Sequence, residues 1–513
     1  MGKKIVQEIK RFDSGITGSL DSLFHQHFDI FSDPNRLIPY RSTEAEQNAT
    51  SAANFGLFNP RNFQLGKDGK MYALGDDNAG GLAQVLEKTD PTTGNWGLST
   101  TAVGTGVVVY GAFIEWGTTP AFYMFSGTNR LSAWTIGGTF NNTVSSLTLT
   151  TITSVAQGVV GADDQLYMFY NNKVVRVTRA GVATDDVLTN LPSDMRIVSA
   201  CRWGSYIAIG MAYGTSATAI PSGVSKVFLW DMVTTTTISD VIDWGEGALR
   251  VLGNVEGRIV GVSDKYLTNP ISLSQGSMVV RMWSGGAPQV FKEIVANQLV
   301  TKDSGTYDNV VTRFPRDVVV KDNKMYWVAS VPFGASTSTE STYKLGIWAF
   351  GRKDRNADFA VSLDYVHEGI DTAKYYINSF GNAGNYWFIS HGDAGLVHKT
   401  DDATNYTHTS IYETEKFGDG KTTRKIVGVS VMTDALPTAG QVVLKYKKDE
   451  ETSFTTIFTN TTDNSIRHTA INIESSGATL PTYKRLILRV ESTGNAVVTG
   501  IRLVSELIED DVL

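Results

Sequence analysis

The side chains that could do chemistry in this sequence are few and widely spaced. The only cysteine, Cys201, lies between Ala200 and Arg202 in an apolar segment, without the surroundings that activate a thiol, so we expect a buried structural thiol. His25 and His27 form the one close histidine pair. On a strand both would face the same side and could share a metal ion, but no third ligand is nearby. These residues predict neither thiol catalysis nor a metal site.

Paired carboxylates are the other candidates for catalysis, because two neighbouring acids can act as general acid and base. Such pairs occur at Asp76-Asp77, Asp163-Asp164 and Asp401-Asp402, all in polar turns where solvent keeps both groups ionised. The same turns offer weak oxygen ligands for Ca²⁺, but none completes a binding loop. No phosphate loop, nucleophile elbow or zinc-protease motif occurs. We therefore predict that the chain has no catalytic residues, no metal and no cofactor, and is not an enzyme.

The composition narrows the class of protein further. The 513 residues include 49 glycines, only 19% charged residues and 42% hydrophobic residues, a balance that favours strands and turns around a packed core. The net charge of −7 argues against a nucleic-acid coat, which needs clustered Lys and Arg. Residues 1–16 carry no secretory signal, and the longest apolar run, Val107 to Ile114, is too short for a membrane helix. We expect a soluble protein without disulfides.

Residues 55–405 repeat a pair of strands about every 50 residues, the period of a β-propeller blade. The first strand of each pair is predicted at 70–74, 121–125, 165–169, 205–209, 258–262, 324–328 and 385–389. The second is predicted at 82–85, 131–134, 174–177, 227–230, 280–283, 345–348 and 396–399. Polar turns such as Gly66 to Gly69 and Gly161 to Asp164 join several of these pairs to a preceding strand. The pattern predicts an all-β chain with a seven-bladed propeller; a large sandwich or a β-solenoid is the competing interpretation.

Three consecutive units, the fourth to the sixth, carry hairpin extensions. They comprise Gly214 to Gly223, Ser263 to Ser277 and Pro332 to Thr342. Extensions on successive blades would make one sector of the rim taller. We interpret this sector as a contact surface, although surface loops also tolerate insertions at little energetic cost.

The two ends of the chain lack this repeat. Residues 1–54 mix charges with isolated apolar residues, and we predict an extended N-terminal arm that orders by docking on a neighbouring subunit; a disordered tail is the alternative. The candidate assembly contacts in this arm are Phe28, Ile30, Phe31, Leu37 and Tyr40. Residues 406–513 contain six or seven short strand patterns separated by turn signals, which predicts a β-sandwich of jelly-roll type.

Two families with propellers fail on their motifs. Sialidases carry repeated Ser-x-Asp-x-Gly-x-Thr-Trp boxes, and Thr301 to Tyr307 approaches one such box once, without the tryptophan. Trp230-Asp231 is similar to the dipeptide that ends WD-repeat blades, but the companion Gly-His is missing from every unit. The chain therefore lacks the signatures of both families.

The arm segment Phe28 to Arg41, the divergent propeller, and the C-terminal segments Ile411 to Phe417, Lys425 to Val429 and Val442 to Lys448 together resemble structural proteins of tailed bacteriophages. The resemblance implies a non-enzymatic tail or neck component, of nozzle or hub type, that is made in the host cytoplasm and located in the virion. It implies as partners other copies of the chain in a ring and other virion proteins, without specific nucleic-acid binding or a membrane. The alternative is a carbohydrate-binding receptor-recognition protein or adhesin with a host glycan as partner, motivated by the tryptophans that end several strands.

Overall fold

The computed structural model describes most of the chain in separate ranges. These are residues 4–12, 15–16, 24–46, 59–76, 83–98, 113–138, 140–141, 143–213, 224–266, 276–296, 318–332, 343–366, 377–391, 396–400, 406, 408–451, 453–471 and 480–508. Within these ranges the protein is all-β: strands alternate with turns, and the one helical element is the 3₁₀ turn η1 (Val144–Ser146). The chain forms two compact units, unit 1 (residues 1–42, 346–368 and 401–513) and unit 2 (residues 43–345 and 369–400).

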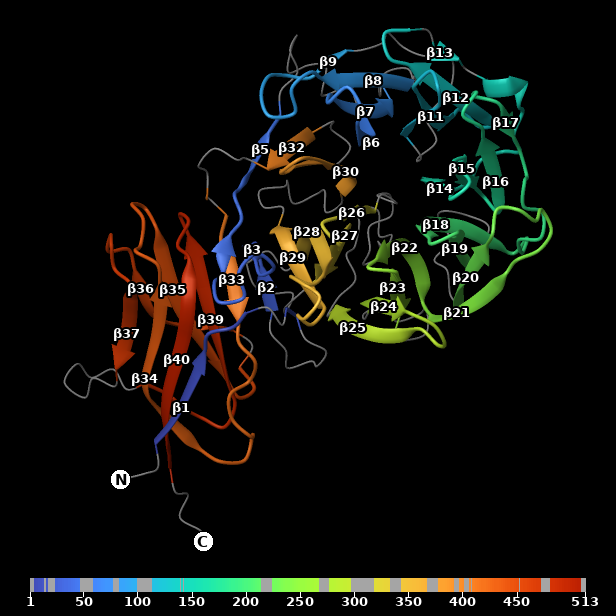
Figure 1. Ribbon diagram of the computed structural model, residues 1–513. Helices are drawn as coiled ribbons and strands as arrows, with labels where there is room; N and C mark the ends of the chain where they lie inside the picture. The colour runs from blue at the N-terminus through green and yellow to red at the C-terminus, as the bar shows by residue number, and fades with distance from the viewer. Residues whose placement is uncertain are drawn as a thin grey trace, which may run out of the picture. The chain divides into compact units, whose positions relative to one another are not determined.

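Unit 2 consists of small antiparallel sheets, most of them built from four strands that follow one another in the sequence (Figure 1). The first two sheets contain β6 (Asn59–Leu65), β7 (Met71–Asp76), β8 (Ala83–Lys88) and β9 (Gly97–Leu98), then β10 (Ile114–Trp116), β11 (Ala121–Ser126), β12 (Arg130–Thr135) and β13 (Phe140–Asn141). The third and fourth contain β14 (Val155–Val160), β15 (Leu166–Tyr170), β16 (Lys173–Val177) and β17 (Ala183–Thr184), then β18 (Met195–Trp203), β19 (Tyr206–Tyr213), β20 (Val224–Trp230) and β21 (Asp240–Glu246). The fifth contains β22 (Ala248–Val255), β23 (Arg258–Tyr266), β24 (Gly276–Trp283) and β25 (Gln289–Ala296), and a hairpin of β26 (Val319–Lys321) and β27 (Lys324–Pro332) follows.

Hydrophobic clusters join each of these sheets to the next. Tyr72 of β7 packs with Phe122 of β11, and a separate cluster joins Phe125 of β11 to Tyr170 of β15. Further clusters join the third sheet to the fourth and the fourth to the fifth. Because the first four sheets bury both faces against their neighbours, their central strands are nearly continuous apolar runs rather than alternating ones, as in β11, where all six residues are buried.

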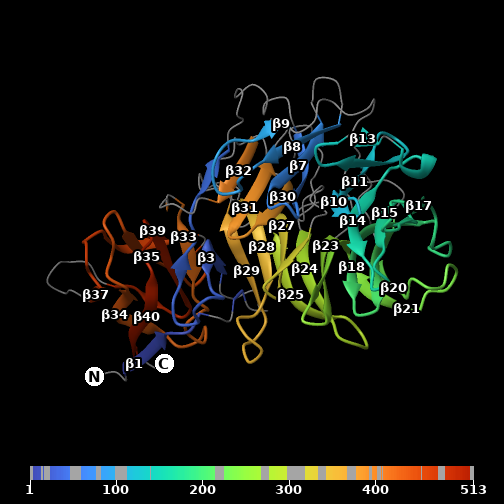
Figure 2. The same cartoon turned by 45° about the horizontal axis from the view of Figure 1, so that its top comes forward.

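The last sheet of unit 2 joins strands from opposite ends of the unit. It contains β30 (Ile377–Ala383), β31 (Tyr386–His391), β32 (Leu396–Thr400) and, at its edge, β5 (Thr43–Ala45). Strand β5 pairs with β32, with Lys399 opposite Glu44. The sheet also shares a hydrophobic cluster with the first sheet, in which Phe63, Trp96 and Phe388 are in contact. Figure 2 shows β30–β32 beside β7 and β8.

Unit 1 contains strands from the start, the middle and the end of the sequence. One sheet has the order β1 (Lys4–Ile9), β40 (Val498–Leu507), β34 (Arg424–Thr433) and β37 (Arg467–Ile471), with β38 (Thr482–Tyr483) also on β34. A second series runs β28 (Tyr343–Gly351, in this unit from Gly346), β29 (Ala360–Val366), β2 (Phe24–Gln26), β33 (Ser410–Glu413), β39 (Leu486–Thr493), β35 (Gln441–Lys448) and β36 (Thr455–Asn460). A short ribbon pairs β3 (Phe28–Asp29) with β4 (Ile38–Pro39). Along β40 buried and half-buried residues largely alternate, the pattern of a sheet with one covered face.

The N-terminal segment is not an arm that extends away from its own chain, contrary to the expectation from the sequence. Strand β1 adds to the edge of β40, with Lys4 opposite Glu506, and β2 pairs with β29 on one side and β33 on the other. Strand β5 completes the last sheet of unit 2. The segment lacks a period of its own because β1, β2 and β5 obtain their hydrogen bonds from partners several hundred residues later.

The boundaries of the two units also differ from the expected divisions at 54/55 and 405/406. Residues 1–42 belong to unit 1 rather than to a separate arm, and residues 346–368 join them. The physical reason is the backbone pairing of β2 with β29: His27 N–H donates to Leu363 C=O at 2.9 Å, and Ile16 N–H donates to Val361 C=O at 2.9 Å.

The predicted repeat of strand pairs is confirmed at the level of strands. All fourteen predicted strands correspond to strands from β7 and β8 through to β31 and β32, within a few residues at either end. The extension Gly214 to Gly223 lies outside the described residues, as do the central parts of the other two extensions and the segment Thr301 to Tyr307. Among the described residues, none forms a helix long and apolar enough to cross a membrane.

Candidate functional site

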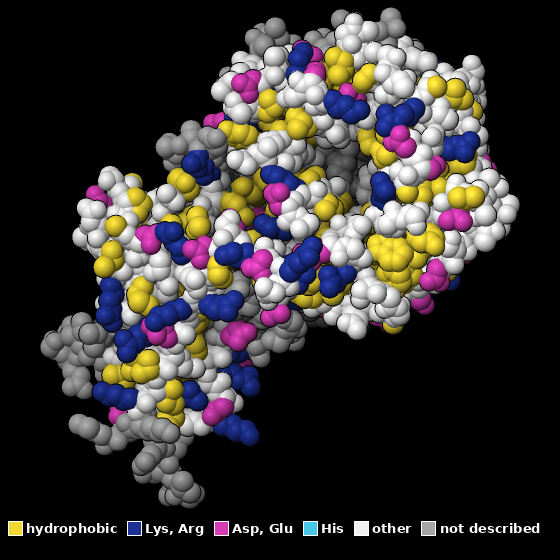
Figure 3. Space-filling model, viewed as in Figure 1, with side chains coloured by type: hydrophobic (Ala, Val, Ile, Leu, Met, Phe, Trp, Pro, Cys, Tyr) yellow, Lys and Arg dark blue, Asp and Glu magenta, His cyan; other side chains and the backbone are white. Residues whose placement is uncertain are grey.

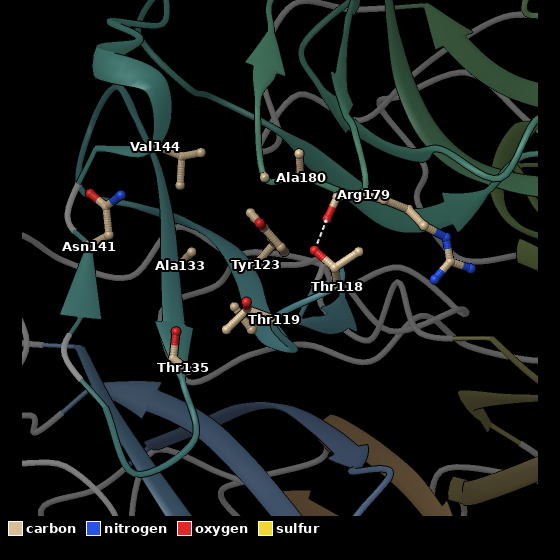
Figure 4. A pocket seen from close by; sticks show the side chains of 11 residues that line it. Thr118, Thr119, Tyr123, Ala133, Thr135, Asn141, Val144, Arg179 and Ala180 are labelled. Atoms are coloured by element: carbon tan, nitrogen blue, oxygen red, sulfur yellow. Dashed lines mark hydrogen bonds between the residues drawn. The ribbon is translucent and has the colours of Figure 1, made fainter.

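A small polar pocket in unit 2 is the candidate site. It lies between the second sheet and the β16–β17 turn of the third, and its volume is about 250 Å³ (Figure 4). Its lining comes from the β10–β11 turn, the facing strands β11 and β12, the end of β13, the start of η1 and the β16–β17 turn. The lining residues are Thr118, Thr119, Ala121, Tyr123, Ala133, Thr135, Asn141, Val144, Arg179, Ala180 and Gly181.

Backbone hydrogen bonds fix the turn that closes one side of this pocket. Thr118 N–H donates to Arg179 C=O at 2.9 Å, and the Thr118 hydroxyl donates to the same oxygen at 3.2 Å. On the other side Ala183 N–H donates to the Ser145 hydroxyl at 2.8 Å. Gly181 has a φ of +80°, which a residue with a side chain rarely adopts, and a Cβ there would lie 3.0 Å from the Tyr123 hydroxyl. A glycine is therefore required for the turn to pass over Tyr123.

Tyr123 is the most informative residue of the pocket. Its side chain is only 5% exposed, and it comes from the buried strand β11. Within the described part of the chain its hydroxyl has no hydrogen-bond partner, and Figure 4 shows it directed between Ala133 and Ala180. Burial raises the pKa of this phenol, so the hydroxyl is protonated and able both to donate and to accept a hydrogen bond. A buried hydroxyl without a protein partner is available to a ligand or to water.

The charged groups beside the pocket satisfy one another. The Arg179 guanidinium forms a two-point ion pair with Asp164, with Nη2 2.8 Å from Oδ1, and lies 4.8 Å from the ring centre of Trp116. This pairing lowers the pKa of Asp164 and raises that of Arg179. In Figure 4 the Arg179 side chain extends away from the other lining residues. The pocket therefore presents hydroxyl and amide groups rather than a free charge.

A second polar cluster lies where β5 completes the last sheet of unit 2. The Glu46 carboxylate contacts Lys88 Nζ at 2.5 Å and Lys399 Nζ at 3.5 Å, and it accepts a hydrogen bond from the Trp96 indole at 2.9 Å. Glu44 lies 3.2 Å from the same Lys399 ammonium. Lys88, Glu46 and Lys399 are at most 7% exposed. Two carboxylates thus balance two ammonium groups, and the arrangement joins the N-terminal segment to the first and last sheets.

The predicted assembly contacts are buried inside their own chain. Phe28, Ile30 and Leu37 are completely buried and Phe31 is 3% exposed. Tyr40 is half-buried: its ring packs on Tyr365 and its hydroxyl donates to Asp364 at 3.2 Å. These residues are thus covered within their own chain, and their docking on another copy stays a prediction. The apolar residues find partners in their own chain, at no cost in association entropy.

The remaining sequence candidates are structural. His25 and His27 lie in unit 1 and are completely buried, and burial lowers the pKa of each to about 3. Asp163 accepts a hydrogen bond from the Tyr167 hydroxyl at 2.7 Å in a turn. Cys201 is partly buried in unit 2, and burial raises the pKa of its thiol to about 12, which makes it inert. Among the residues that the structure describes, no three His, Cys, Asp or Glu side chains are grouped as metal ligands.

The tryptophans that end the strands lie in the core. Trp134 and Trp230 are 1% exposed, Trp348 is completely buried and Trp283 is 6% exposed. They are therefore not the exposed aromatic platform that motivated a carbohydrate-binding interpretation of these strands.

The pocket was not predicted from the sequence. Tyr123 and Thr135 belong to ordinary apolar strand patterns, and the pocket they line forms only where the β16–β17 turn of the next sheet lies beside them.

Comparisons with known proteins assign no family. No family model matches the chain, and no curated protein matches it. Solved structures that match the chain weakly include a glycoside hydrolase (11% identity, covering 87% of this chain and 98% of that chain, TM-score 0.28) and virginiamycin B lyase from Staphylococcus aureus (11% identity, 77% and 99%, TM-score 0.32). A gluconolactonase from Xanthomonas campestris is a third (12% identity, 56% and 85%, TM-score 0.31). Similarities this weak assign no activity to the chain.

Proposed function

We propose that this chain is a non-enzymatic structural subunit of a tailed-phage virion, a tail or neck ring component that contacts its neighbours through the rim of unit 2. In this proposal residues 55–405 form a seven-bladed β-propeller, with β26 to β29 as its sixth blade, and residues 406–513 form a β-sandwich. The clusters that join each sheet to the next, and the pairing of β5 with β32, support the propeller. The alternation of buried residues along β40 supports the sandwich.

The observation that carries an assembly role is the exposure of valines on peripheral strands of successive sheets. Val241 is 47% exposed on β21, Val290 is 56% exposed on β25, and Val233, before β21, is 82% exposed. Strands β21 and β25 are the last in their sheets, so each has one edge without a strand partner in the described structure. Apolar side chains beside open strand edges are the features that subunit contacts cover.

The N-terminal segment has a different role in this proposal from the one its sequence predicts. It contributes strands to the sheets of both units: β1 and β2 to unit 1, and β5 to unit 2. In this proposal the N-terminal segment is used up within its own subunit. The rim of unit 2 therefore makes the contacts between subunits.

Surface charge agrees with a protein partner rather than a nucleic acid. On the face shown in Figure 3, Lys and Arg side chains are interspersed with Asp and Glu. Binding to phosphate backbones requires an unbroken basic surface.

Quantitative mass spectrometry of purified particles tests this role. The chain should be present in several copies per virion, in a fixed ratio to the other tail and neck proteins. Its absence from purified particles, or a trace amount that varies between preparations, contradicts the proposal. The strand-end tryptophans do not offer a carbohydrate-binding surface, because their side chains are buried.

A further inference from the structure

We propose that the pocket around Tyr123 binds a neutral saccharide unit. This inference does not depend on the virion role proposed above, because it rests on the pocket alone. Its starting point is that Tyr123 is 5% exposed, yet in the described structure its hydroxyl has no protein partner and faces a space of about 250 Å³. Among the described residues no group satisfies this hydroxyl, so the pocket has one polar group placed for an external ligand.

Two tyrosines in the neighbouring sheets show how a buried hydroxyl is satisfied there by the protein. Tyr72 and Tyr167 occupy the equivalent buried strands of the first and third sheets. The Tyr72 hydroxyl donates to Asp68 and the Tyr167 hydroxyl donates to Asp163, each at 2.7 Å. Burial of a tyrosine in these sheets is thus accompanied by a hydrogen bond in both neighbouring cases. Tyr123 lies one position later in β11 and therefore on the opposite face of its sheet, where its hydroxyl faces the pocket instead of an aspartate.

The other polar groups in the lining match the hydroxyls of a sugar. Thr119 and Thr135 contribute hydroxyls without partners among the described residues, and the Asn141 amide oxygen accepts from Thr143 N–H at 3.0 Å, which leaves its NH₂ group free. Hydroxyl and amide groups both donate and accept, as a ring of sugar hydroxyls requires. The arrangement comes from four separate elements, β11, β12, β13 and the β10–β11 turn, so these groups converge from several directions.

Apolar side chains complete the lining. Ala121, Ala133 and Val144 are buried and face the pocket together with the ring of Tyr123. A sugar ring has a C–H face that packs on such a surface while its hydroxyls reach the polar groups. This combination of a few polar groups with apolar walls is typical of small-molecule sites.

The charges beside the pocket favour a neutral ligand over an anion. The Arg179 guanidinium already contacts Asp164 through two nitrogen atoms and lies over Trp116. Recruiting Arg179 to an anion would break this ion pair and turn the side chain from its position. An uncharged sugar binds without that rearrangement.

Binding of methyl glycosides of glucose, galactose, mannose, N-acetylglucosamine and N-acetylgalactosamine to the full-length protein tests the proposal, by saturation-transfer NMR. At least one glycoside should bind with a millimolar dissociation constant. Tyr123→Phe should weaken that binding about tenfold, the loss expected from one hydrogen bond. The variant should fold normally, because it removes no hydrogen bond within the protein.

Matched controls separate the pocket from other surfaces. Tyr167→Phe removes a hydroxyl outside the pocket and should leave the dissociation constant of the glycoside unchanged. Thr135→Val keeps the shape of the wall and should weaken binding. Failure of all five glycosides to bind, or equal binding by wild type and Tyr123→Phe, overturns the proposal. Competition by inorganic phosphate also overturns it, because it would show an anion site at Arg179.

These results are independent of particle composition. A chain that is present in virions but binds no glycoside supports the structural role and refutes the pocket. A chain that binds a glycoside but is absent from virions supports the pocket and refutes the structural role.

Discussion

The ammonium of Lys88 lies 2.5 Å from the carboxylate of Glu46, and both side chains are almost completely buried, at 1% and 5% exposed. The pair joins a residue that follows β5 to the first sheet of unit 2. Removing one partner of a buried ion pair leaves the other charge without compensation, which is far more costly than losing an exposed pair.

Glu46→Gln should therefore destabilise the protein by about 3–5 kcal/mol, because it leaves the ammonium groups of Lys88 and Lys399 buried with insufficient negative charge. Urea unfolding of the full-length chain, monitored by tryptophan fluorescence, measures the change. Asp164→Asn, which breaks an exposed ion pair with Arg179, is the matched control and should have little effect. An unchanged unfolding midpoint for Glu46→Gln would show that the ion pair does not stabilise the attachment of the N-terminal segment to unit 2.

Three tyrosine variants distinguish structural hydroxyls from the free one. Tyr72→Phe and Tyr167→Phe each remove a 2.7 Å hydrogen bond to an aspartate and should each lower the free energy of unfolding by about 1 kcal/mol. Tyr123→Phe should change it by less than about 0.5 kcal/mol. Differential scanning calorimetry of the three proteins gives the comparison. If Tyr123→Phe is as destabilising as the other two, the hydroxyl has a structural partner and the pocket is not free.

Acid should destabilise unit 1 through its two buried histidines. Burial lowers the pKa of His25 and of His27 from 6.5 to about 3, and neighbouring His408 adds to the effect on His27. The folded chain keeps both rings neutral, whereas the unfolded chain binds protons below pH 6.5. Their contribution to stability is thus complete above pH 6.5 and is lost progressively as the pH falls toward 3. At pH 5.5 each histidine should lower the free energy of unfolding by about 1.4 kcal/mol relative to its value at pH 8.

Unfolding free energies measured between pH 8 and pH 5 test this dependence. The decline should be smaller in His25→Phe, which has no proton to bind at that position. A stability that is constant down to pH 5 would show that the histidines are protonated in the folded chain.

Substitution of the rim valines should block assembly without unfolding the subunit. Val241→Lys and Val290→Lys place charges on the peripheral strands β21 and β25, where a neighbouring subunit would have to bury them. Analytical ultracentrifugation and complementation of particle assembly measure the effect. Ile466→Lys, at a position 62% exposed in unit 1, is the control and should assemble normally. If a chain that carries both Val241→Lys and Val290→Lys still forms normal particles, the contacts between subunits do not involve these rim strands.

Sequence reasoning succeeded where the determinants are local. The hairpin at Gly161 to Asp164 was predictable because a turn motif separates two apolar strands, and β14 and β15 pair there in the structure. Within residues 406–513 the same holds for β35 and β36, which follow one another in the sequence and pair in the structure. In both cases strands that are neighbours in the sequence are neighbours in the sheet, whereas β33 pairs with β39 and β34 with β40.

Non-local pairing explains what the sequence could not reveal. Lys4 lies opposite Glu506, and Gln26 lies opposite Leu363 in a parallel pair. No local pattern in the first 54 residues encodes those partners, so the apolar residues there looked available to another subunit. The pocket was hidden similarly, because the free Tyr123 hydroxyl depends on the position of the Arg179–Gly181 turn in the next sheet.

Gold labelling of this chain in intact tailed particles, followed by electron microscopy, tests the central claim most directly. A ring subunit predicts label at one level of the tail or neck in most particles, with several gold positions around the axis. Intact particles that carry no label, while the free protein in the same lysate is labelled, would contradict the structural role.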